Sequence, residues 1–200
     1  MAAPIDFYFD FSSPYGYLGA QRIDALAAKF GRTVDWRPML LGVAFKETGM
    51  APLTAIPLKG EYSKRDFLRT ARLNGIRFRM PEKFPVATQA PARIMLWLKR
   101  SDPALAVRVA KALYHAYFVE GTDISSPETA AAIAANEGVD PVAARAAVDE
   151  PANKEALKRE VDGAIARGVF GSPFVFVEGE PFWGFDRFDQ IERWLATGGF

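Results

Sequence analysis

The chain has 200 residues, of which 50% are hydrophobic and 24% are charged, and its formal net charge is +1. This balance excludes an intrinsically disordered protein, and the basic residues form no run that would indicate nucleic acid or an anionic membrane as a partner. The sequence has no cysteine and one histidine, His115. Disulfides, thiolate metal sites and a redox couple carried by the protein are therefore excluded, and no metal site is predicted.

The N-terminal segment predicts a β-α-β unit. Residues 5–11, IDFYFDF, are rich in aromatics and are typical of a strand, and residues 33–38 alternate as a second strand. Between them, a serine pair followed by proline at 12–14 predicts the start of a helix over residues 15–30. Such a unit has parallel strands and a right-handed crossover.

The same N-terminal region lacks the features of a signal peptide. No basic segment precedes an apolar stretch of the 7–15 residues that a secretory signal requires. No run in the chain approaches the roughly 18 apolar residues of a membrane-spanning helix. We therefore expect a cytoplasmic protein.

Residues 39–167 differ in character, because strand-like runs disappear and alanine-rich segments take their place. Helix-start signals, an aspartate or serine followed by proline, stand at residues 102–103, 126–127 and 140–141. Between residues 42 and 85 the many prolines and glycines predict a long loop, interrupted by one helix over about residues 63–74. The whole segment is predicted to be helical.

The strand signal returns near the C-terminus. Residues 174–177 and 181–184 flank the short turn 178–180, which predicts an antiparallel hairpin. An amphipathic helix over about residues 187–195 follows. The chain is thus predicted to be an α/β protein in which β-α-β and β-β-α halves flank a helical insertion.

Two short motifs are candidates for a functional site. By itself, Ser13 before Pro14 is a common helix start, and Ser172 before Pro173 is a common start of an edge strand. Each motif alone is a weak signal. One motif lies in the predicted β-α-β half and the other in the predicted β-β-α half, on either side of the helical segment. Their occurrence together in this order strengthens the functional interpretation of both.

The two motifs resemble those of a known family. Residues 13–19, SPYGYLG, resemble the Cys-Pro-x-Cys-Tyr-x-Gly stretch of the DsbA disulfide oxidoreductases, with Ser13 and Gly16 in place of the two cysteines. Residues 169–173 resemble the cis-proline loop of that family, and residues 182–187 resemble its following strand and helix. A serine at the first position and a W-G-x-D-R ending are similar to kappa-class glutathione transferases and bacterial 2-hydroxychromene-2-carboxylate isomerases.

The resemblance covers essentially the whole chain and implies its architecture. Residues 1–42 and 166–200 are expected to form a thioredoxin-like domain, and residues 43–165 an all-helical insertion domain that closes over the cleft. The resemblance also implies a homodimer.

The resemblance further implies glutathione as the cofactor and Ser13 as the catalytic residue. A hydrogen bond to a charged group contributes about 1.5–3 kcal/mol, and a helix N-terminus adds about 0.3–1 kcal/mol. Together these would lower the pKa of a bound thiol enough to make the thiolate dominant near neutral pH. Ser13 is better suited as a hydrogen-bond donor than as a nucleophile, because no nearby base in the sequence would activate it.

Other glutathione-binding positions come from the same resemblance. Ser172 and Pro173 would lie along the cysteinyl segment of the tripeptide, and the pair Phe185 and Asp186 would meet its α-amino end. Lys59 would face a glutathione carboxylate. Two alternatives remain open from the residues themselves: Asp186 also suits an N-cap of the closing helix, and Lys59 also suits a solvated side chain.

The substrate side departs from the family pattern. Met50 stands where family members commonly have asparagine, and Phe84 stands where the isomerases have a tyrosine that meets the substrate. Lys46 is retained and would pair with a substrate carboxylate. The expected substrate is therefore a small aromatic or electrophilic carboxylate.

Three functions are consistent with these residues. The leading prediction is a glutathione-dependent cis/trans isomerase of the 2-hydroxychromene-2-carboxylate type. The alternatives are a kappa-like glutathione transferase or peroxidase, and a non-catalytic module that binds glutathione or a peptide. His115 is predicted to be a packed or surface residue, and the remaining aromatic candidates are predicted to be core residues: Trp97, Trp183 and Trp194.

Overall fold

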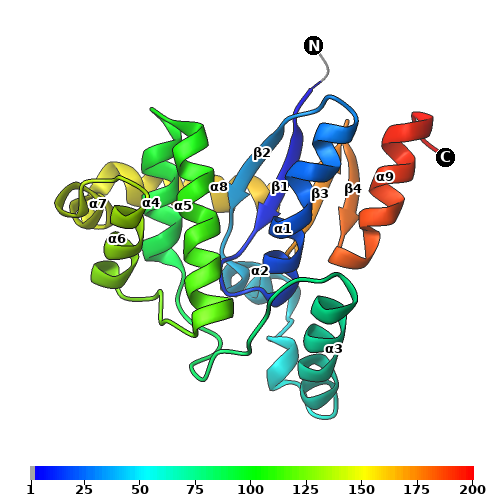
Figure 1. The fold of residues 1–200 in the computed structure, drawn as a ribbon, viewed down its shortest axis with the longest axis horizontal. Helices are drawn as coiled ribbons and strands as arrows, with labels where there is room; N and C mark the ends of the chain where they lie inside the picture. The colour runs from blue at the N-terminus through cyan, green and yellow to red at the C-terminus, as the bar shows by residue number, and fades with distance from the viewer. Residues whose placement is uncertain (1–2) are drawn as a thin grey trace.

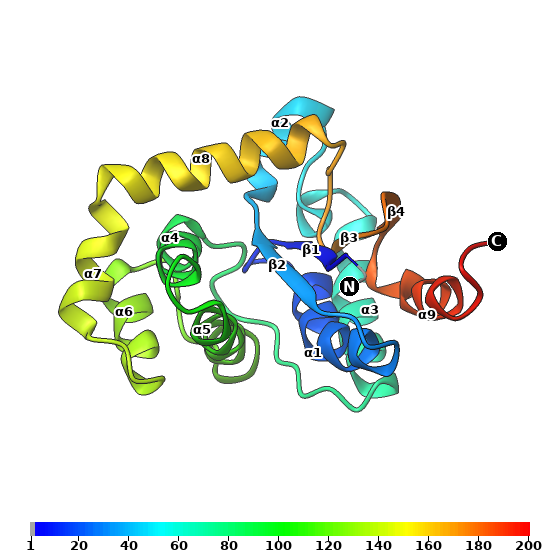
Figure 2. The same cartoon turned by 90° about the horizontal axis from the view of Figure 1, so that it is seen from above.

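The computed structural model describes residues 3–200, which form a four-stranded sheet with helices on both faces (Figures 1 and 2). In chain order the elements are β1 (Ile5–Phe9), α1 (Pro14–Lys29), β2 (Val34–Pro38), α2 (Leu41–Thr48), η1 (Leu53–Ala55), α3 (Lys59–Leu73), α4 (Gln89–Lys99), α5 (Pro103–His115), η2 (Ala116–Glu120), α6 (Pro127–Asn136), α7 (Pro141–Asp149), α8 (Pro151–Ala166), β3 (Phe174–Val177), β4 (Glu180–Trp183), η3 (Phe185–Arg187) and α9 (Phe188–Thr197). The predicted thioredoxin-like α/β fold is confirmed.

The strands run in the order β2-β1-β3-β4. β1 pairs in parallel with β2, with Ile5 opposite Val34, and antiparallel with β3, with Phe7 opposite Val175. β3 and β4 form an antiparallel hairpin. The predicted β-α-β and β-β-α halves are thus confirmed, and β1 lies in the middle of the sheet, where both of its edges are paired.

Alternate residues of β1 face opposite sides of the sheet. Phe7 and Phe9 belong to the main core, which also contains Leu18 of α1. Tyr8 faces a second, smaller core that α2 and α8 complete, with Ala164 as one of its members. Figure 2 shows the two layers, with α1 on one side of the sheet and α8 on the other.

An aromatic cluster joins the sheet to the helical segment. Tyr17 of α1 lies with its ring centroid 5.8 Å from that of Tyr114 and 5.3 Å from that of Phe118. Tyr114 also lies 5.7 Å from Phe9 of β1. Because such pairs contribute about 0.5–1.5 kcal/mol each beyond the burial of area, α5 and η2 are held firmly against the sheet. The division into two domains stays a prediction.

The predicted long loop between residues 42 and 85 is wrong at its start. α2 occupies residues where a loop was expected, and its N-cap residue Leu40 forms no capping bond with its side chain. No local sequence signal announces such a helix, since its first N–H group is satisfied from elsewhere in the fold. The helix expected over residues 63–74 is present as α3.

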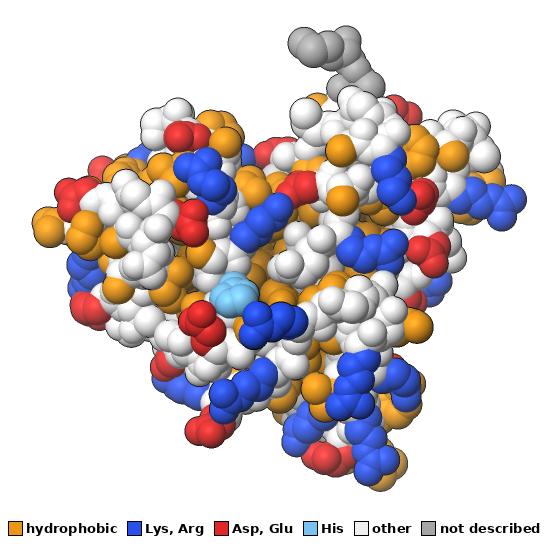
Figure 3. All heavy atoms as spheres, viewed as in Figure 1, with side chains coloured by type: hydrophobic (Ala, Val, Ile, Leu, Met, Phe, Trp, Pro, Cys, Tyr) orange, Lys and Arg blue, Asp and Glu red, His pale blue; other side chains and the backbone are white. Residues whose placement is uncertain are grey.

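The burial of His115 and of the three tryptophans can be compared with the prediction from the sequence. His115 is a surface residue, with a side chain that is 49% exposed (Figure 3). Trp97 and Trp194 pack against the core, but the prediction for Trp183 is wrong, because β4 is an edge strand and its last side chain is 48% exposed. Among residues 3–200, no helix combines the length and the apolar character that crossing a membrane requires.

Candidate active site

Ser13 lies at the turn between β1 and α1 and caps the helix. Its Oγ accepts a hydrogen bond from the backbone N–H of Gly16 at 3.0 Å and donates one to the carbonyl oxygen of Ser172 at 2.9 Å. Pro14 follows in the first turn, where its missing N–H costs nothing. The hydroxyl therefore lies at the positive end of α1. Since Ser13 is only 5% exposed, the hydroxyl is shielded from bulk solvent.

The loop before β3 meets this turn. The bond between Ser172 and Pro173 is cis. The Oγ of Ser172 accepts a hydrogen bond from the backbone N–H of Asp10 at 3.0 Å, in addition to the bond that its carbonyl oxygen accepts from Ser13. The fold therefore brings the two motifs into direct contact, although 159 positions separate the two serines.

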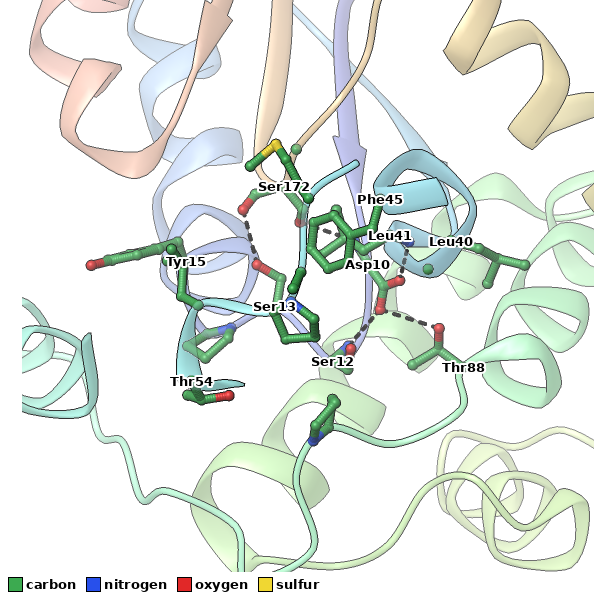
Figure 4. Close-up of a pocket in the computed structure, with 18 of the residues that line it drawn as sticks. Asp10, Ser12, Ser13, Tyr15, Leu40, Leu41, Phe45, Thr54, Thr88 and Ser172 are labelled. Atoms are coloured by element: carbon green, nitrogen blue, oxygen red, sulfur yellow. Dashed lines mark hydrogen bonds between the residues drawn. The ribbon is translucent and has the colours of Figure 1, made fainter. Parts of the chain in front are cut away.

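A cavity of about 890 Å³ opens beside Ser13 (Figure 4). One part of its lining, the serine wall, consists of Ser12, Ser13 and Ser172. A second part, the apolar wall, consists of Phe45, Met50, Leu53 and Phe84. Typical ligand cavities measure about 300–1,000 Å³, so this cavity has room for a tripeptide together with a small second ligand.

Six of the residues predicted from the sequence line this cavity: Ser13, Lys46, Phe84, Ser172, Phe185 and Asp186. Within the described part of the chain, Pro173 and Lys59 lie outside the lining. Pro173 lies behind the site, packed where a side chain on Gly19 would be. Lys59 is the first residue of α3 and is exposed.

Two of the predicted charged residues, Lys46 and Asp186, line the cavity with exposed side chains. Lys46 is exposed in the last turn of α2. Asp186 has a side chain that is 72% exposed and lies 3.5 Å from the guanidinium of Arg187. The alternative role of Asp186 as an N-cap is wrong, because α9 begins after Arg187 without a capping bond from any side chain.

Gly16 leaves no room for a side chain. A Cβ at this position would lie 2.6 Å from Oγ of Ser172, 2.8 Å from the hydroxyl of Tyr114 and 3.0 Å from Cβ of Ser13. Contacts below 3.0 Å force the neighbours to move. Position 16 therefore does not accommodate a second reactive side chain beside Ser13 without rearrangement.

Asp10 is a buried acid next to the serine wall that the sequence analysis missed. Burial raises the pKa of its carboxyl group, although hydrogen bonds from Ser12 and Leu41 oppose this shift. The sequence held one signal, an acidic residue directly after the strand and three positions before Ser13.

Tyr15 and Asp66, which line the cavity on the side of α3, were also missed by the sequence analysis. The hydroxyl of Tyr15 donates a short hydrogen bond to Asp66, which also binds Arg69. Burial and the neighbouring Asp66 raise the pKa of Tyr15 well above its usual value. Tyr15 therefore remains a protonated phenol, and no local pattern in the sequence predicts its partner.

Trp183 is a third missed residue. Its indole lies over Gly171, where a Cβ would come within 2.1 Å of the indole nitrogen. The indole also packs edge-on against Phe170, with ring centroids 4.8 Å apart. The glycine of the loop before β3 is thus required by the close approach of an exposed tryptophan at the mouth of the cavity.

Comparisons with known proteins agree with this geometry. The family model of the DSBA-like thioredoxin domain matches residues 4–196. A 2-hydroxychromene-2-carboxylate isomerase of Sphingobium xenophagum is 30% identical, over 98% of this chain and 99% of the relative. A kappa 2 glutathione S-transferase of Caenorhabditis elegans is 26% identical, over 96% of this chain and 91% of the relative.

A solved structure of a 2-hydroxychromene-2-carboxylate isomerase superposes with a TM-score of 0.86 at 29% identity, over 98% of this chain and 95% of that one. The likeness therefore extends through the sheet, the helical segment and both motifs. The chain belongs to the DSBA-like thioredoxin domain family, as an enzyme of the group that the 2-hydroxychromene-2-carboxylate isomerases and the kappa-class glutathione transferases form.

Proposed function

We propose that this enzyme is a glutathione-dependent isomerase of the 2-hydroxychromene-2-carboxylate type that acts in the breakdown of aromatic compounds. The observation that carries the proposal is the Ser13 hydroxyl, buried at the N-terminus of α1 and beside Ser172 in a cavity of about 890 Å³. The chain has no cysteine. A bound glutathione would supply the thiol that the chemistry needs.

Ser13 would keep the glutathione sulfur ionised. A hydroxyl hydrogen rotates about the Cβ–Oγ bond, so Ser13 can turn its donor from the Ser172 carbonyl oxygen toward a sulfur in the cavity. A hydrogen bond to a charged group contributes about 1.5–3 kcal/mol. The positive end of α1 adds to this stabilisation, so the thiol loses its proton at a lower pH than in water.

Five further residues would contribute to holding the tripeptide. The backbone of Ser172, next to Pro173, would run along the cysteinyl segment as an added strand does. Phe185 and Asp186 border the cavity on the side of η3, where the exposed carboxylate suits the α-ammonium group. Lys59 lies outside the lining and would reach a glutathione carboxylate only at the rim.

The reaction would need no change in oxidation state. The thiolate adds to the activated alkene, a C–S bond forms, and the π electrons move onto the conjugated carbonyl oxygen. The former double bond is then single and rotates. Its re-formation breaks the C–S bond and returns the thiolate unchanged. Lys46 would hold the substrate carboxylate while the aromatic ring lies against Phe84.

Two other functions remain candidates. Phe84 favours a kappa-like transferase or peroxidase, because the apolar wall lacks the phenol group that the isomerases have at this position, whereas Met50 departs from the family as a whole. In that case the thiolate attacks an electrophile and is consumed. The third candidate is a non-catalytic module that binds glutathione or a peptide. The family resemblance also supports a homodimer.

The role of the Ser13 hydroxyl is tested by ultraviolet titration of bound glutathione. Ser13→Ala should raise the pKa of the bound thiol, and the thiolate band near neutral pH should fall. The matched control is Ser126→Ala, which removes the capping serine of α6 away from the cavity and should leave the band unchanged. A thiolate band that persists in Ser13→Ala at an unchanged pKa would contradict the role of Ser13.

Recovery of glutathione separates the three candidates. After many turnovers the isomerase returns intact glutathione, whereas a transferase accumulates a stoichiometric conjugate. A binding module reacts with neither type of substrate. Full activity without added glutathione would contradict the thiol mechanism altogether.

A further inference from the structure

Asp10 is hydrogen-bonded through its backbone to two segments that are distant in the sequence. Its N–H donates to Oγ of Ser172 at 3.0 Å, and its carbonyl oxygen accepts from the hydroxyl of Tyr114 at 2.9 Å. Both bonds are buried. The end of β1 is therefore fixed between the loop before β3 and helix α5.

The carboxyl group of Asp10 binds three more donors (Figure 4). Oδ1 accepts from the backbone N–H of Ser12 at 2.7 Å and from the hydroxyl of Thr88 at 3.1 Å. Oδ2 accepts from the backbone N–H of Leu41 at 2.7 Å. The residue is 3% exposed, so these donors have no competing water.

The bond to Leu41 gives α2 its N-terminal cap. The residue in the N-cap position, Leu40, has no polar side chain, and Leu41 is the first helical residue. An N–H group in the first turn has no partner within its helix. Asp10 supplies that partner from the end of β1. The helix that it caps carries Phe45 and Lys46, which both line the cavity.

The bond to Thr88 connects Asp10 to the start of α4. Thr88 is the N-cap residue of α4; its side chain accepts no capping bond, and its hydroxyl donates to Asp10. Thr88 lies four residues after Phe84, and the residues between them also line the cavity. One carboxyl group thus contacts the serine wall, the helix that carries Phe45 and Lys46, and the end of the segment that carries Phe84.

We propose that Asp10 is a positioning residue that sets the distance between the Ser13 thiol site and the side chains that receive the second ligand, Lys46, Phe45 and Phe84. This role rests on the proposed glutathione-dependent function. Asp10 borders the cavity, but in this proposal its carboxyl group stays bound to its three donors and does not contact the sulfur. It acts through α2 and through the segment before α4.

Only a carboxyl group suits this position. Its two oxygens face three donors, so an amide in its place would turn one NH₂ group toward a backbone N–H. In Asp10→Asn the amide NH₂ group would face the backbone N–H of Leu41 or that of Ser12, so one of these two bonds would be replaced by two donors facing each other. The size of the residue stays the same, which separates the loss of bonding from the loss of packing.

The test compares the binding of two ligands by calorimetry, glutathione and its S-(4-carboxybenzyl) conjugate. In Asp10→Asn the Kd of the conjugate should rise about tenfold, the effect of one lost hydrogen bond in a buried site. The Kd of glutathione itself should change by less than about twofold, because the Asp10 carboxyl takes no part in the bonds of Ser13 to Gly16 and of Ser172 to the Asp10 backbone. Thr88→Val removes one donor and should give a rise of about threefold for the conjugate.

Glu160→Gln is the matched control. Glu160 binds Arg37 at 2.7 Å on the face of the sheet that α8 covers, so the change removes a carboxylate away from the cavity. It should lower the melting temperature and leave both Kd values unchanged. Equal changes of both Kd values in Asp10→Asn and in Thr88→Val, or no change in either, would overturn the role of Asp10. A wild-type protein that binds no glutathione would instead contradict the proposed function.

Discussion

The serine wall and the apolar wall of the cavity are stabilised in different ways. Ser13 and Ser172 are 5% and 8% exposed and are joined by a hydrogen bond across 159 positions of the chain. Met50 and Leu53 are each 40% exposed, and η1, which begins at Leu53, has α3 as its main neighbour. A change in the serine wall therefore disturbs the fold, whereas a change in the apolar wall alters recognition while the fold remains.

The largest effect is expected from Gly16→Ala, which breaks the serine wall. The added Cβ displaces the hydroxyl of Tyr114 and Oγ of Ser172, which lie 2.8 and 2.6 Å away. Overpacking of this kind costs about 1–3 kcal/mol. Denaturant unfolding should show this loss in the free energy of unfolding, and the affinity for glutathione should fall at least about tenfold.

The matched control is Gly163→Ala in α8. A Cβ at Gly163 would meet no atom within 4 Å, and alanine is favoured over glycine inside a helix by about 0.5–1 kcal/mol. The control should therefore stabilise the protein and leave glutathione binding unchanged. Equal unfolding free energies for Gly16→Ala and the wild type would show that the serine wall tolerates a side chain.

A smaller effect is expected from Lys46→Gln, which removes the cation beside the apolar wall. Since Lys46 is exposed, its attraction to a substrate carboxylate is screened by water, and the KM of the isomerase substrate should rise about three- to tenfold. The kcat value should change little, because this contact is made before and during the reaction. Steady-state kinetics at low and high salt measure the effect.

Lys158→Gln in α8 is the control for the loss of one charge, since Lys158 pairs with Asp162 on the surface. Its KM should equal that of the wild type. An unchanged KM in Lys46→Gln as well would exclude Lys46 from the binding of the carboxylate.

The strands and the first helix were predictable because their signals are local. β1, β2 and the β3-β4 hairpin follow from aromatic runs and a short turn, and α1 follows from serine and proline at its start. α2 was not predictable, because its first N–H group is capped by Asp10 across 31 positions of the chain. The start of α3 was also missed, since Leu58 before it has a positive φ of 67° that its sequence does not announce.

In the candidate active site, too, residues with a local sequence signal were predictable and residues defined by distant contacts were not. Ser13 and Ser172 each lie in a short motif, so the sequence pointed to both. The partner of Tyr15 lies 51 positions away on α3, and its identity depends on how that helix packs. Trp183 reads as a core residue by type alone, and only its place on an edge strand puts it at the mouth of the cavity.

The smallest effect is expected from Phe84→Tyr, which adds a hydroxyl group to the apolar wall and sharpens its role in choosing the substrate. A neutral hydrogen bond contributes about 0.5–1.5 kcal/mol. The kcat/KM value for 2-hydroxychromene-2-carboxylate should therefore rise about threefold, while the value for an aryl halide that offers no hydroxyl group should not rise. Phe200→Tyr, at a position that is 68% exposed near the C-terminus, is the control. Equal changes for both substrates would mean that Phe84 supports the cavity without distinguishing its ligands.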